Sequence, residues 1–496
     1  MDGYDLEKIA QSKLASKLSL IFKKEMLPDN PRGFHQGLTL LGNSLLWVAP
    51  LIALLVGWIG NTMGGLELPA ALTLAIAIWT ALWWIFEAVP IPVASLIPLA
   101  FLPMFEVLSP QSVGEKYGHP LVLLLLGGFL LSKAMEKSGA HRRIALAMVR
   151  ACPASDKFLV LGFMGATAFL SMWISNTACT LMMLPMALAV IQGSENKKLN
   201  IPLLLGIAFA ANVGGIGTPI GTPPNLVMMG AYKDLGFPEL SFSDWMKVGL
   251  PVTASMTLVI WLWLTRKVSG KGTVSLPLPG SWSKAETRTL TIFGLTALAW
   301  ITRSEPFGGW KTWLDLPQAN DASVAFIAVI FLFCLPNGEK KGERLLDWKT
   351  ANQIPWGMLI LVGAGLCLGE GFKQSGLSES IASALSGVEN LPALGVLVGI
   401  CLLVTFLTEM TSNTATTNLL MPILGAAAVS ANLDPKLLMI PAALSASCAF
   451  MLPVATIPNA IVFGTGKISV KRMATEGFVL NLIGAGVVTG VIYFLL

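Results

Sequence analysis

Long apolar stretches recur along almost the whole chain, and they limit its fold more than any other feature. Only 12% of the 496 residues are Asp, Glu, Lys or Arg, about half the share of a typical soluble domain, and 54% are apolar. This composition excludes a soluble enzyme, a disordered chain and a fibrous repeat. Because about 20 apolar residues cross a bilayer as a helix, we expect an all-α polytopic membrane protein.

The apolar stretches predict eleven spans and two interrupted regions, 158–192 and 391–428. Each interrupted region has an uncharged Ser-Asn-Thr triplet near its middle. Limbs of about 15–20 residues are marginal for a full crossing, so each region is either a tight pair of spans or a re-entrant hairpin. The uncharged triplets favour hairpins with buried tips. The eleven spans are expected at 40–61, 69–88, 91–106, 121–137, 202–230, 246–266, 289–302, 322–336, 356–372, 441–466 and 474–496.

The distribution of Lys and Arg predicts the orientation of the chain. With the N-terminus inside, 26 of the 33 Lys and Arg fall on the inner side. Since cytoplasmic loops are rich in Lys and Arg, we expect an N-in, C-out protein of the cell (inner) membrane. The leader, residues 1–37, carries Lys among apolar residues at helical spacing. It is expected to lie on the inner surface as an amphipathic helix, or else to be a solvated arm.

The two halves of the chain resemble each other. The triplet at 175–177 returns at 412–414, and Thr222-Pro223-Pro224-Asn225 returns at nearly the same offset as Thr456-Ile457-Pro458-Asn459. The first triplet is entered from the inside and the second from the outside, so the halves have opposite orientation. Inverted repeats with interrupted helices are typical of secondary transporters. We expect the repeats at 38–267 and 289–496, joined by a Gly/Pro/Ser-rich cytoplasmic linker at 268–288.

Each half also contains a helix that cannot be continuous. Pro223 and Pro224 interrupt the region 202–230, and Pro458 interrupts the region 441–466. Proline lacks the N–H donor and clashes with the preceding turn, so the backbone opens there. Open backbone at membrane depth must line a cavity inside the protein. Its carbonyls, together with Ser, Thr and Asn oxygens, suit a hard monovalent cation, and the helix N-termini at the triplets suit an anion.

These features predict a site that holds Na⁺ beside a small oxyanion. Ser, Asn and Thr in membrane helices often only bridge neighbouring helices, but two symmetric triplets beside two symmetric breaks favour a binding site. Glu409 is a buried structural carboxylate, a proton or cation site, or an exposed outer residue. The sequence has neither a clustered His/Asp/Cys constellation nor a basic, aromatic-rich run, so we expect no enzyme activity and no nucleic-acid partner.

The run from Ser447 to Val462 (Ser-Cys-Ala-Phe-Met-Leu-Pro-Val-Ala-Thr-Ile-Pro-Asn-Ala-Ile-Val) resembles the signature of the divalent anion/sodium symporter family. The two Ser-Asn-Thr triplets are that family's other hallmark. The resemblance covers roughly residues 40–496. It implies eleven spans plus two hairpins, a homodimer, and a transport domain that slides as an elevator against a scaffold.

The same resemblance implies the residues of the site. The first sodium site corresponds to Ser171, Ser175, Asn176 and Gly221, and the second to Thr408, Thr411, Asn413 and Ala455. The substrate carboxylates correspond to Ser175, Asn176, Thr177, Thr222, Ser412, Asn413, Thr414 and Thr456. Ile457 stands where relatives commonly have Pro, directly after Thr456, so the choice of substrate is the open point.

We therefore expect a secondary active transporter in which co-transported Na⁺ drives electrogenic import of C4-dicarboxylates such as succinate, malate or fumarate. Two alternatives keep the fold: a sodium-independent dicarboxylate exchanger, and a sodium-coupled citrate or sulfate transporter. No His, Lys or Arg that could replace a cation stands at the site positions, which favours sodium coupling. The number of Na⁺ ions is left open.

Overall fold

The computed structural model describes residues 32–153, 155–270, 280–384 and 392–495. Every regular element in these residues is a helix, and one isolated β-bridge joins Pro336 to Arg344. The all-helical prediction is confirmed. Leader residues 1–31, where the surface helix is expected, lie outside the described residues.

Eight helical segments of the described chain are long and apolar enough to cross a membrane. The protein is therefore a multi-pass membrane protein. On the first of these segments Trp47, Leu51, Leu54 and Trp58 are exposed, as expected for side chains that face lipid. The eight segments are Ser44–Thr62, Leu68–Phe86, Pro110–Ser138, Asn176–Gly193, Lys197–Gly217, Phe242–Thr265, Trp356–Gln374 and Val470–Leu495.

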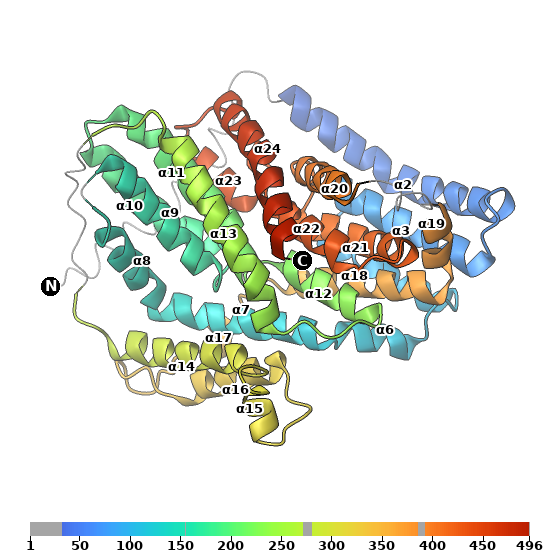
Figure 1. The fold of residues 1–496 in the computed structure, drawn as a ribbon, viewed down its shortest axis with the longest axis horizontal. Coiled ribbons are helices and arrows are strands. Elements are labelled where there is room, and N and C mark those ends of the chain that lie inside the picture. The colour runs from blue at the N-terminus through green and yellow to red at the C-terminus, as the bar shows by residue number, and fades with distance from the viewer. Residues whose placement is uncertain (1–31, 154, 271–279, 385–391, 496) are drawn as a thin grey trace.

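The first half of the chain runs from blue to green in Figure 1. Proline is among the first residues of α3, α6, α7 and α12, where its missing N–H has no intrahelical partner to lose. The elements are α2 (Arg32–Thr62), α3 (Leu68–Phe86), α4 (Ile91–Ala94), α5 (Leu96–Met104), α6 (Pro110–Tyr117), α7 (Pro120–Ser138), α8 (Ala140–Arg150), α9 (Asp156–Ser171), α10 (Asn176–Gly193), η1 (Lys197–Leu199), α11 (Asn200–Gly214), η2 (Gly215–Gly217), α12 (Pro223–Asp234) and α13 (Phe242–Thr265).

The second half runs from yellow to red. It repeats a turn of the first half: φ is +77° at Gly139, between α7 and α8, and +76° at Gly376, before α19. Glycine adopts this conformation without the strain that a Cβ brings. The elements are α14 (Lys284–Ile301), α15 (Gly309–Trp313), α16 (Asp321–Cys334), α17 (Trp348–Ala351), α18 (Trp356–Gln374), α19 (Leu377–Ala384), α20 (Ala393–Thr408), α21 (Asn413–Ser430), α22 (Lys436–Ala446), α23 (Ile457–Phe463) and α24 (Val470–Leu495).

In the middle of the molecule, helices of the first half pack against helices of the second half. α12 packs against α21 and α22, α23 packs against α10 and α11, and α13 packs against α24 (Figure 1). Phe209 of α11 and Phe450, which follows α22, are fully buried where the halves meet, with ring centroids 5.0 Å apart. The two interrupted regions and the two broken helices therefore share one core.

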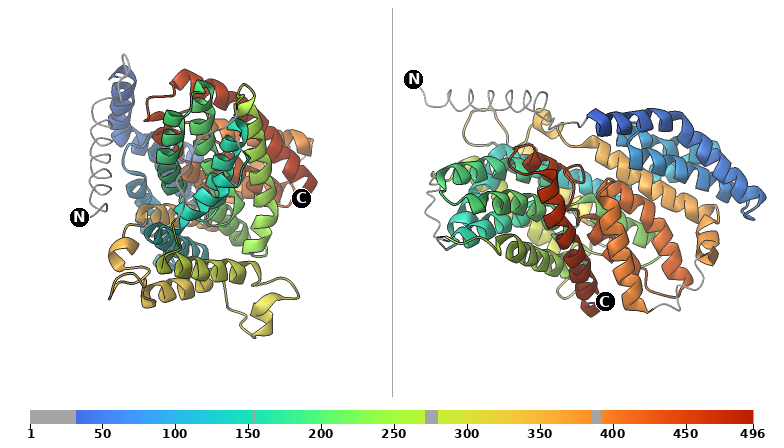
Figure 2. Two further views of the ribbon diagram at one scale, coloured as in Figure 1. Left: turned by 90° about the vertical axis from the view of Figure 1, so that its left-hand side faces the viewer. Right: turned by 90° about the horizontal axis from the view of Figure 1, so that it is seen from above.

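The remaining helices surround this centre. α2 and α3 pack side by side at one end (Figure 2), and α18 packs against α3, α5, α6 and α21. α14 and α16 pack against α7 and lie with α15 along the lower edge of Figure 1.

Candidate functional site

The first triplet lies at the turn between α9 and α10. Ser171, the last residue of α9, is fully buried, and its Oγ lies 2.6 Å from Asn176 Oδ1 and 2.7 Å from the carbonyl oxygen of Ala211 in α11. A hydroxyl has one proton, so it can donate to only one of these two acceptors at a time. We call Ser171 Oγ, Asn176 Oδ1 and Ala211 O the first oxygen cluster. It has more lone pairs than donors, as a cation site requires.

The second triplet repeats this arrangement between α20 and α21. Thr408 is fully buried, and its Oγ1 lies 2.7 Å from Asn413 Oδ1 and 2.9 Å from the carbonyl oxygen of Ala446 in α22. These three atoms form the second oxygen cluster. The hydroxyl and the amide follow their counterparts in the first cluster at the same offset that separates the two triplets.

A helix begins directly at each triplet, with α10 starting at Asn176 and α21 at Asn413. The first N–H groups of a helix have no intrahelical acceptor and attract anions. Ser175 uses its hydroxyl to accept one of them, from Ala178 N at 3.2 Å, whereas Ser412 makes no such cap. Thr177 is half-buried and Thr414 is buried beside these N-termini.

The first broken helix is held open by Asn225. α11 ends at Gly214 and α12 begins at Pro223, and Thr222 between them is extended, with φ −149° and ψ 141°. Asn225 Nδ2 donates to the carbonyl oxygens of Gly215 at 2.9 Å and Thr218 at 2.7 Å. The side-chain amide therefore satisfies carbonyls that the open backbone leaves without partners.

The second broken helix is held open in the same way by Asn459. Its Nδ2 donates to the carbonyl oxygens of Ala449 and Leu452, both at 3.1 Å. Thr456 is extended, with φ −144° and ψ 152°, and caps α23 by accepting from Asn459 N at 3.3 Å. Each of these residues follows its counterpart around Asn225 at one constant offset, although Thr222 in the first break makes no side-chain cap.

Two glycines let the first broken helix approach the first triplet. A Cβ on Gly221 would lie 2.5 Å from the carbonyl oxygen of Gly215, and a Cβ on Gly215 would lie 3.1 Å from Asn176 Oδ1. No side chain fits in the first of these spaces. Ser171 and Asn176, two of the residues expected at the first sodium site, are in direct contact, and Gly215 lies between Asn176 and Gly221, a third.

The residues expected at the second sodium site are brought together less completely. Thr408 and Asn413 are in direct contact, but Thr411 Oγ1 lies 2.5 Å from Thr416 Oγ1 and also donates to the Leu407 carbonyl. Ala455 is buried in the opened segment before α23.

Asn212 joins the two halves. Its Nδ2 lies 3.1 Å from Thr456 Oγ1, 3.2 Å from the carbonyl oxygen of Ala449 and 3.3 Å from Asn459 Oδ1. The residue is in α11 and is only 1% exposed. A single side chain of the first half thus contacts the Thr that precedes α23 in the second half.

Comparison with known proteins agrees with this architecture. Residues 81–437 match the family described as citrate transporter. The chain belongs to the citrate transporter family. Both triplets lie within the matched residues, and this match together with the relatives below confirms the expected family, which is one of transporters, not of enzymes.

Two relatives and one solved structure show how far the similarity extends. The transporter is 40% identical over 447 residues to the sodium-dependent dicarboxylate transporter SdcS of Staphylococcus saprophyticus, covering 85% of each chain. It is also 40% identical over 446 residues to the SdcS of Staphylococcus aureus, again covering 85% of each. The crystal structure of the Alcanivorax borkumensis YdaH transporter matches with a TM-score of 0.58 at 16% identity, over 80% of this chain and 90% of that one, which shows a shared fold.

Glu409 of this transporter directly follows Thr408 of the second oxygen cluster. It is 3% exposed. Its Oε1 accepts hydrogen bonds from Phe450 N at 2.6 Å, Met451 N at 2.8 Å and Asn481 Nδ2 at 2.8 Å, and its Oε2 accepts from Leu452 N at 3.0 Å. All four neighbours are donors, which fits an ionised carboxylate. Of the three roles considered from the sequence, this geometry is that of a buried structural carboxylate.

Sequence reasoning did not assign Asn212, Asn225 or Asn459 to the site, and it left Glu409 open. Each of these residues could have been recognised as an amide or a carboxylate inside an apolar stretch. Burying such a group costs free energy unless it has hydrogen-bond partners. Glu409 has no acidic counterpart in the first half, where Met172 occupies the equivalent position directly after Ser171. The two halves therefore have matching oxygen clusters, but only the second has a carboxylate directly after the cluster hydroxyl.

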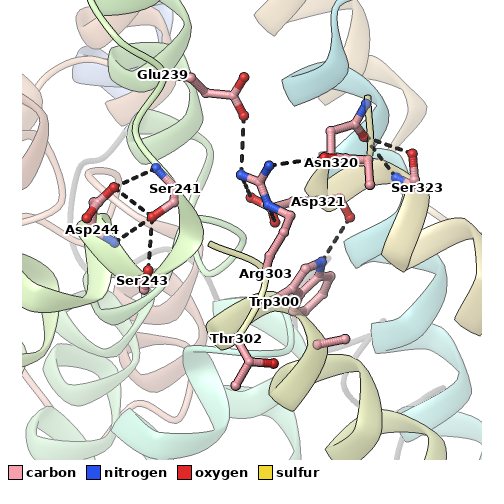
Figure 3. Close-up of polar contacts among 12 residues, drawn as sticks. Glu239, Ser241, Ser243, Asp244, Trp300, Thr302, Arg303, Asn320, Asp321 and Ser323 are labelled. Atoms are coloured by element: carbon pink, nitrogen blue, oxygen red, sulfur yellow. Dashed lines mark hydrogen bonds and ion pairs between the residues drawn. The ribbon is translucent and has the colours of Figure 1, made fainter. Parts of the chain in front are cut away.

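A buried ion pair holds the loop after α12 to α14 and α16 (Figure 3). Arg303 and Asp321 are 4% and 5% exposed, with Nε 2.7 Å from Oδ1. Arg303 also contacts Glu239 at 3.3 Å, and Trp300 Nε1 donates to the Asp321 carbonyl at 2.9 Å. The contact with Glu239 links the segment that leaves the first broken helix to the peripheral helices.

Proposed function

We propose that this protein is a sodium-coupled transporter that imports C4-dicarboxylates such as succinate, malate or fumarate. The observation that carries the proposal is the pair of matching oxygen clusters at the two triplets. Each cluster places a hydroxyl, an amide oxygen and a backbone carbonyl together without a carboxylate among them. Neutral oxygen ligands suit Na⁺, whereas a divalent ion favours carboxylates. The names of the relatives, sodium-dependent dicarboxylate transporters, support the same conclusion.

The dicarboxylate is assigned to the helix N-termini that begin at Asn176 and Asn413. The segments 171–177, 212–222, 408–414 and 446–456 contain no Lys, Arg or His. The charge of the substrate is then balanced by backbone N–H groups and by the co-bound Na⁺. Thr222 and Thr456 precede the two broken helices and supply hydroxyls, with Thr177, Ser412 and Thr414 beside the tips. Ser171, Ser175 and Gly221 complete the first sodium site, and Thr411 and Ala455 complete the second.

In this proposal the chain has eleven spans and two re-entrant hairpins, 158–192 and 391–428, with the N-terminus inside and the C-terminus outside. The repeats 38–267 and 289–496 are inverted, with the linker 268–288 in the cytoplasm. The packing of α12 with α21 and of α23 with α10 supports one rigid transport unit. That unit moves as an elevator against the surrounding helices, in a homodimer.

Sodium supplies the driving force. Moving a dianion into a cell with an interior potential of about −100 mV costs about 4.6 kcal/mol, from about 2.3 kcal/mol per charge. Two Na⁺ cancel this electrical cost, and a third makes import electrogenic. The expected transport is therefore sodium-dependent and carries net positive charge inward.

Uptake into proteoliposomes tests the proposal. Labelled succinate, citrate and sulfate are each offered with an inward sodium gradient and with choline in its place. We expect succinate uptake that needs sodium and rises with an interior-negative potential. Equal succinate uptake in both buffers would refute the coupling. Trans-acceleration by internal succinate without sodium dependence selects an exchanger, and sodium-dependent uptake of citrate or sulfate alone selects the other substrates.

Two variants test the site itself. Asn176→Ala and Asn413→Ala each remove the amide oxygen of one cluster, so both should abolish uptake while the protein still elutes as a folded species. Asn61→Ala is the control, because Asn61 is exposed near the end of α2 and, among the described residues, its amide bonds only the Leu66 carbonyl. Full transport by both cluster variants would overturn the assigned site.

A further inference from the structure

A cavity of about 270 Å³ lies between α12, α18, α19 and α21, away from the residues assigned to sodium and substrate. Each of these helices packs against at least one other of the four. Most of the wall is apolar, with Val227, Leu366, Met421, Pro422 and Val429 among its residues. The volume is close to the lower limit of small-molecule sites, so a ligand of fragment size fits.

The end of the cavity nearer the transport site carries one polar side chain. Asn418 stands five residues after Asn413 in α21 and is 1% exposed. Its Nδ2 donates to the Leu361 carbonyl at 2.8 Å, while no donor among the described residues reaches its Oδ1. This end of the cavity therefore has a buried, unpaired amide oxygen and no charged side chain in its lining, so it offers no counter-charge to an anionic group.

The other end of the cavity, at the ends of the helices, is rich in carboxylates. Asp234, Glu370 and Glu379 line it together with Lys373. Lys116 Nζ lies 2.8 Å from Asp234 and 3.0 Å from Glu370, and Lys373 Nζ donates to the Asp234 carbonyl at 3.1 Å. Glu379 forms no ion pair with any residue in the described ranges. Three carboxylates against two ammonium groups leave one net negative charge at this mouth.

From this we propose that the cavity is a binding site for a small amphiphilic amine, with its apolar body between the four helices and its ammonium group beside Glu379. Glu379 is exposed, and its charge together with the net negative charge of the mouth favours the cation over an acid of the same shape. The site is not part of the sodium and dicarboxylate site proposed above.

An occupied cavity also restrains movement, and this part rests on the proposed function. α12 and α21 belong to the proposed transport unit, whereas α18 and α19 belong to the helices around it. A ligand that contacts all four stabilises the arrangement in which they enclose the cavity, and it shifts the population towards that state. The amine therefore lowers the maximal rate of succinate uptake without raising the succinate concentration needed for half-maximal rate.

Binding is measured first, on the purified full-length protein in lipid nanodiscs. The probes are 4-phenylbutylamine, 4-phenylbutanol and 4-phenylbutanoate, which share one apolar body. A dissociation constant on the order of 0.1–1 mM is expected for the amine from its size. The alcohol should bind at least fivefold more weakly, and the acid should not bind detectably. Equal binding of the three probes, or none by the amine, overturns the proposal.

A filling variant locates the site. A Cβ on Gly369 would meet only Pro422, at 3.7 Å, so Gly369→Leu extends into the cavity without displacing the wall. It should abolish amine binding. Gly395→Leu is the matched control, since Gly395 is exposed on α20 and no atom of the described residues lies within 4 Å of the added Cβ, and it should bind normally. Unchanged amine binding by folded Gly369→Leu overturns the assignment.

Two further experiments test the role of the Glu379 charge and the effect of the bound amine on transport. Glu379→Gln should weaken amine binding at least fivefold while binding of the alcohol stays the same, and an equal effect on both overturns the role of Glu379. Saturating amine should reduce the maximal uptake rate of the native protein but not that of Gly369→Leu. Equal uptake with and without bound amine overturns the restraint. Amine binding by a protein that transports no succinate instead leaves the cavity assigned and refutes only the proposed function.

Discussion

Ser171 Oγ lies 2.6 Å from Asn176 Oδ1, across the turn that joins α9 to α10. The same hydroxyl lies 2.7 Å from a carbonyl oxygen of α11, so one buried atom joins the turn to the helix that breaks. Thr408 makes the corresponding contacts in the second half. Each triplet is therefore joined to its broken helix by one hydroxyl. Replacing that hydroxyl removes a contact with the triplet and a contact with the helix.

Replacing one of these hydroxyls should weaken sodium binding. Thr408→Val keeps the shape of the side chain but removes one ligand oxygen from the second cluster. We expect the sodium concentration for half-maximal succinate uptake to rise about tenfold, which corresponds to about 1.4 kcal/mol. Thr80→Val is the control, because Thr80 is equally buried and its hydroxyl bonds only the Ile76 carbonyl within α3. The same sodium dependence in both variants would remove Thr408 from the site.

Glu409→Gln should disturb the opened segment before α23. One oxygen of the carboxylate becomes an NH₂ group that faces backbone donors, so at least one N–H between Phe450 and Leu452 loses its acceptor. Hydrogen bonds to a charged group contribute roughly 1.5–3 kcal/mol each, so a loss of about 3 kcal/mol in the free energy of unfolding is expected. Succinate uptake should fall more than tenfold.

The control for this change is Glu67→Gln, at an exposed position before α3 that makes no side-chain cap. Denaturation and uptake are compared between the two variants. Native-like stability of Glu409→Gln would show that the negative charge is not needed to hold residues 450–452.

Arg303→Met should destabilise the protein much more than Lys247→Met. Removing Arg303 leaves Asp321 buried without its ion-pair partner, which typically costs about 3–5 kcal/mol. Lys247 also pairs with a carboxylate, Glu305 at 3.0 Å, but both side chains are more than half exposed. An exposed pair contributes about 0–1 kcal/mol. The thermal midpoints of both variants check this, and a similar loss in both would contradict it.

Stability should depend on His141 near neutral pH. Burial lowers the pKa of His141 below its ordinary value, more than its hydrogen bond to the Met135 carbonyl raises it. The unfolded chain then binds a proton from about pH 6.5 downward while the folded protein does not, so stability is lost as the pH falls through this range. The effect is absent well above pH 6.5.

The measurement compares the native protein with His141→Gln at pH 7.5, 6.5 and 5.5. Glutamine does not titrate, so the native protein should lose more stability than the variant between the first and the last pH. The difference in unfolding free energy between the two proteins should therefore narrow on acidification. A constant difference across the three pH values would show that His141 charges equally well in both states.

The sequence predicts some parts of the site better than others. Residues 171–177 and 408–414 stand out because uncharged polar triplets interrupt long apolar regions at matching places in the two halves. Asn225 and Asn459 are visible within the repeated Thr-Pro-x-Asn and Thr-x-Pro-Asn patterns, but the carbonyls that they bond further back along the chain are not. Those contacts depend on how the open backbone curls back on itself, which no local periodicity describes.

The residues alone are enough to predict an all-helical membrane protein with two related halves, each interrupted twice. Apolar length and proline chemistry are local properties, and they act in the same way wherever a segment lies. The contact of Asn212 in one half with Thr456 in the other, and the four hydrogen bonds that Glu409 accepts, become visible in the folded protein. Such contacts depend on how helices far apart in the sequence pack. Many partners could satisfy one buried amide or carboxylate, and packing selects among them.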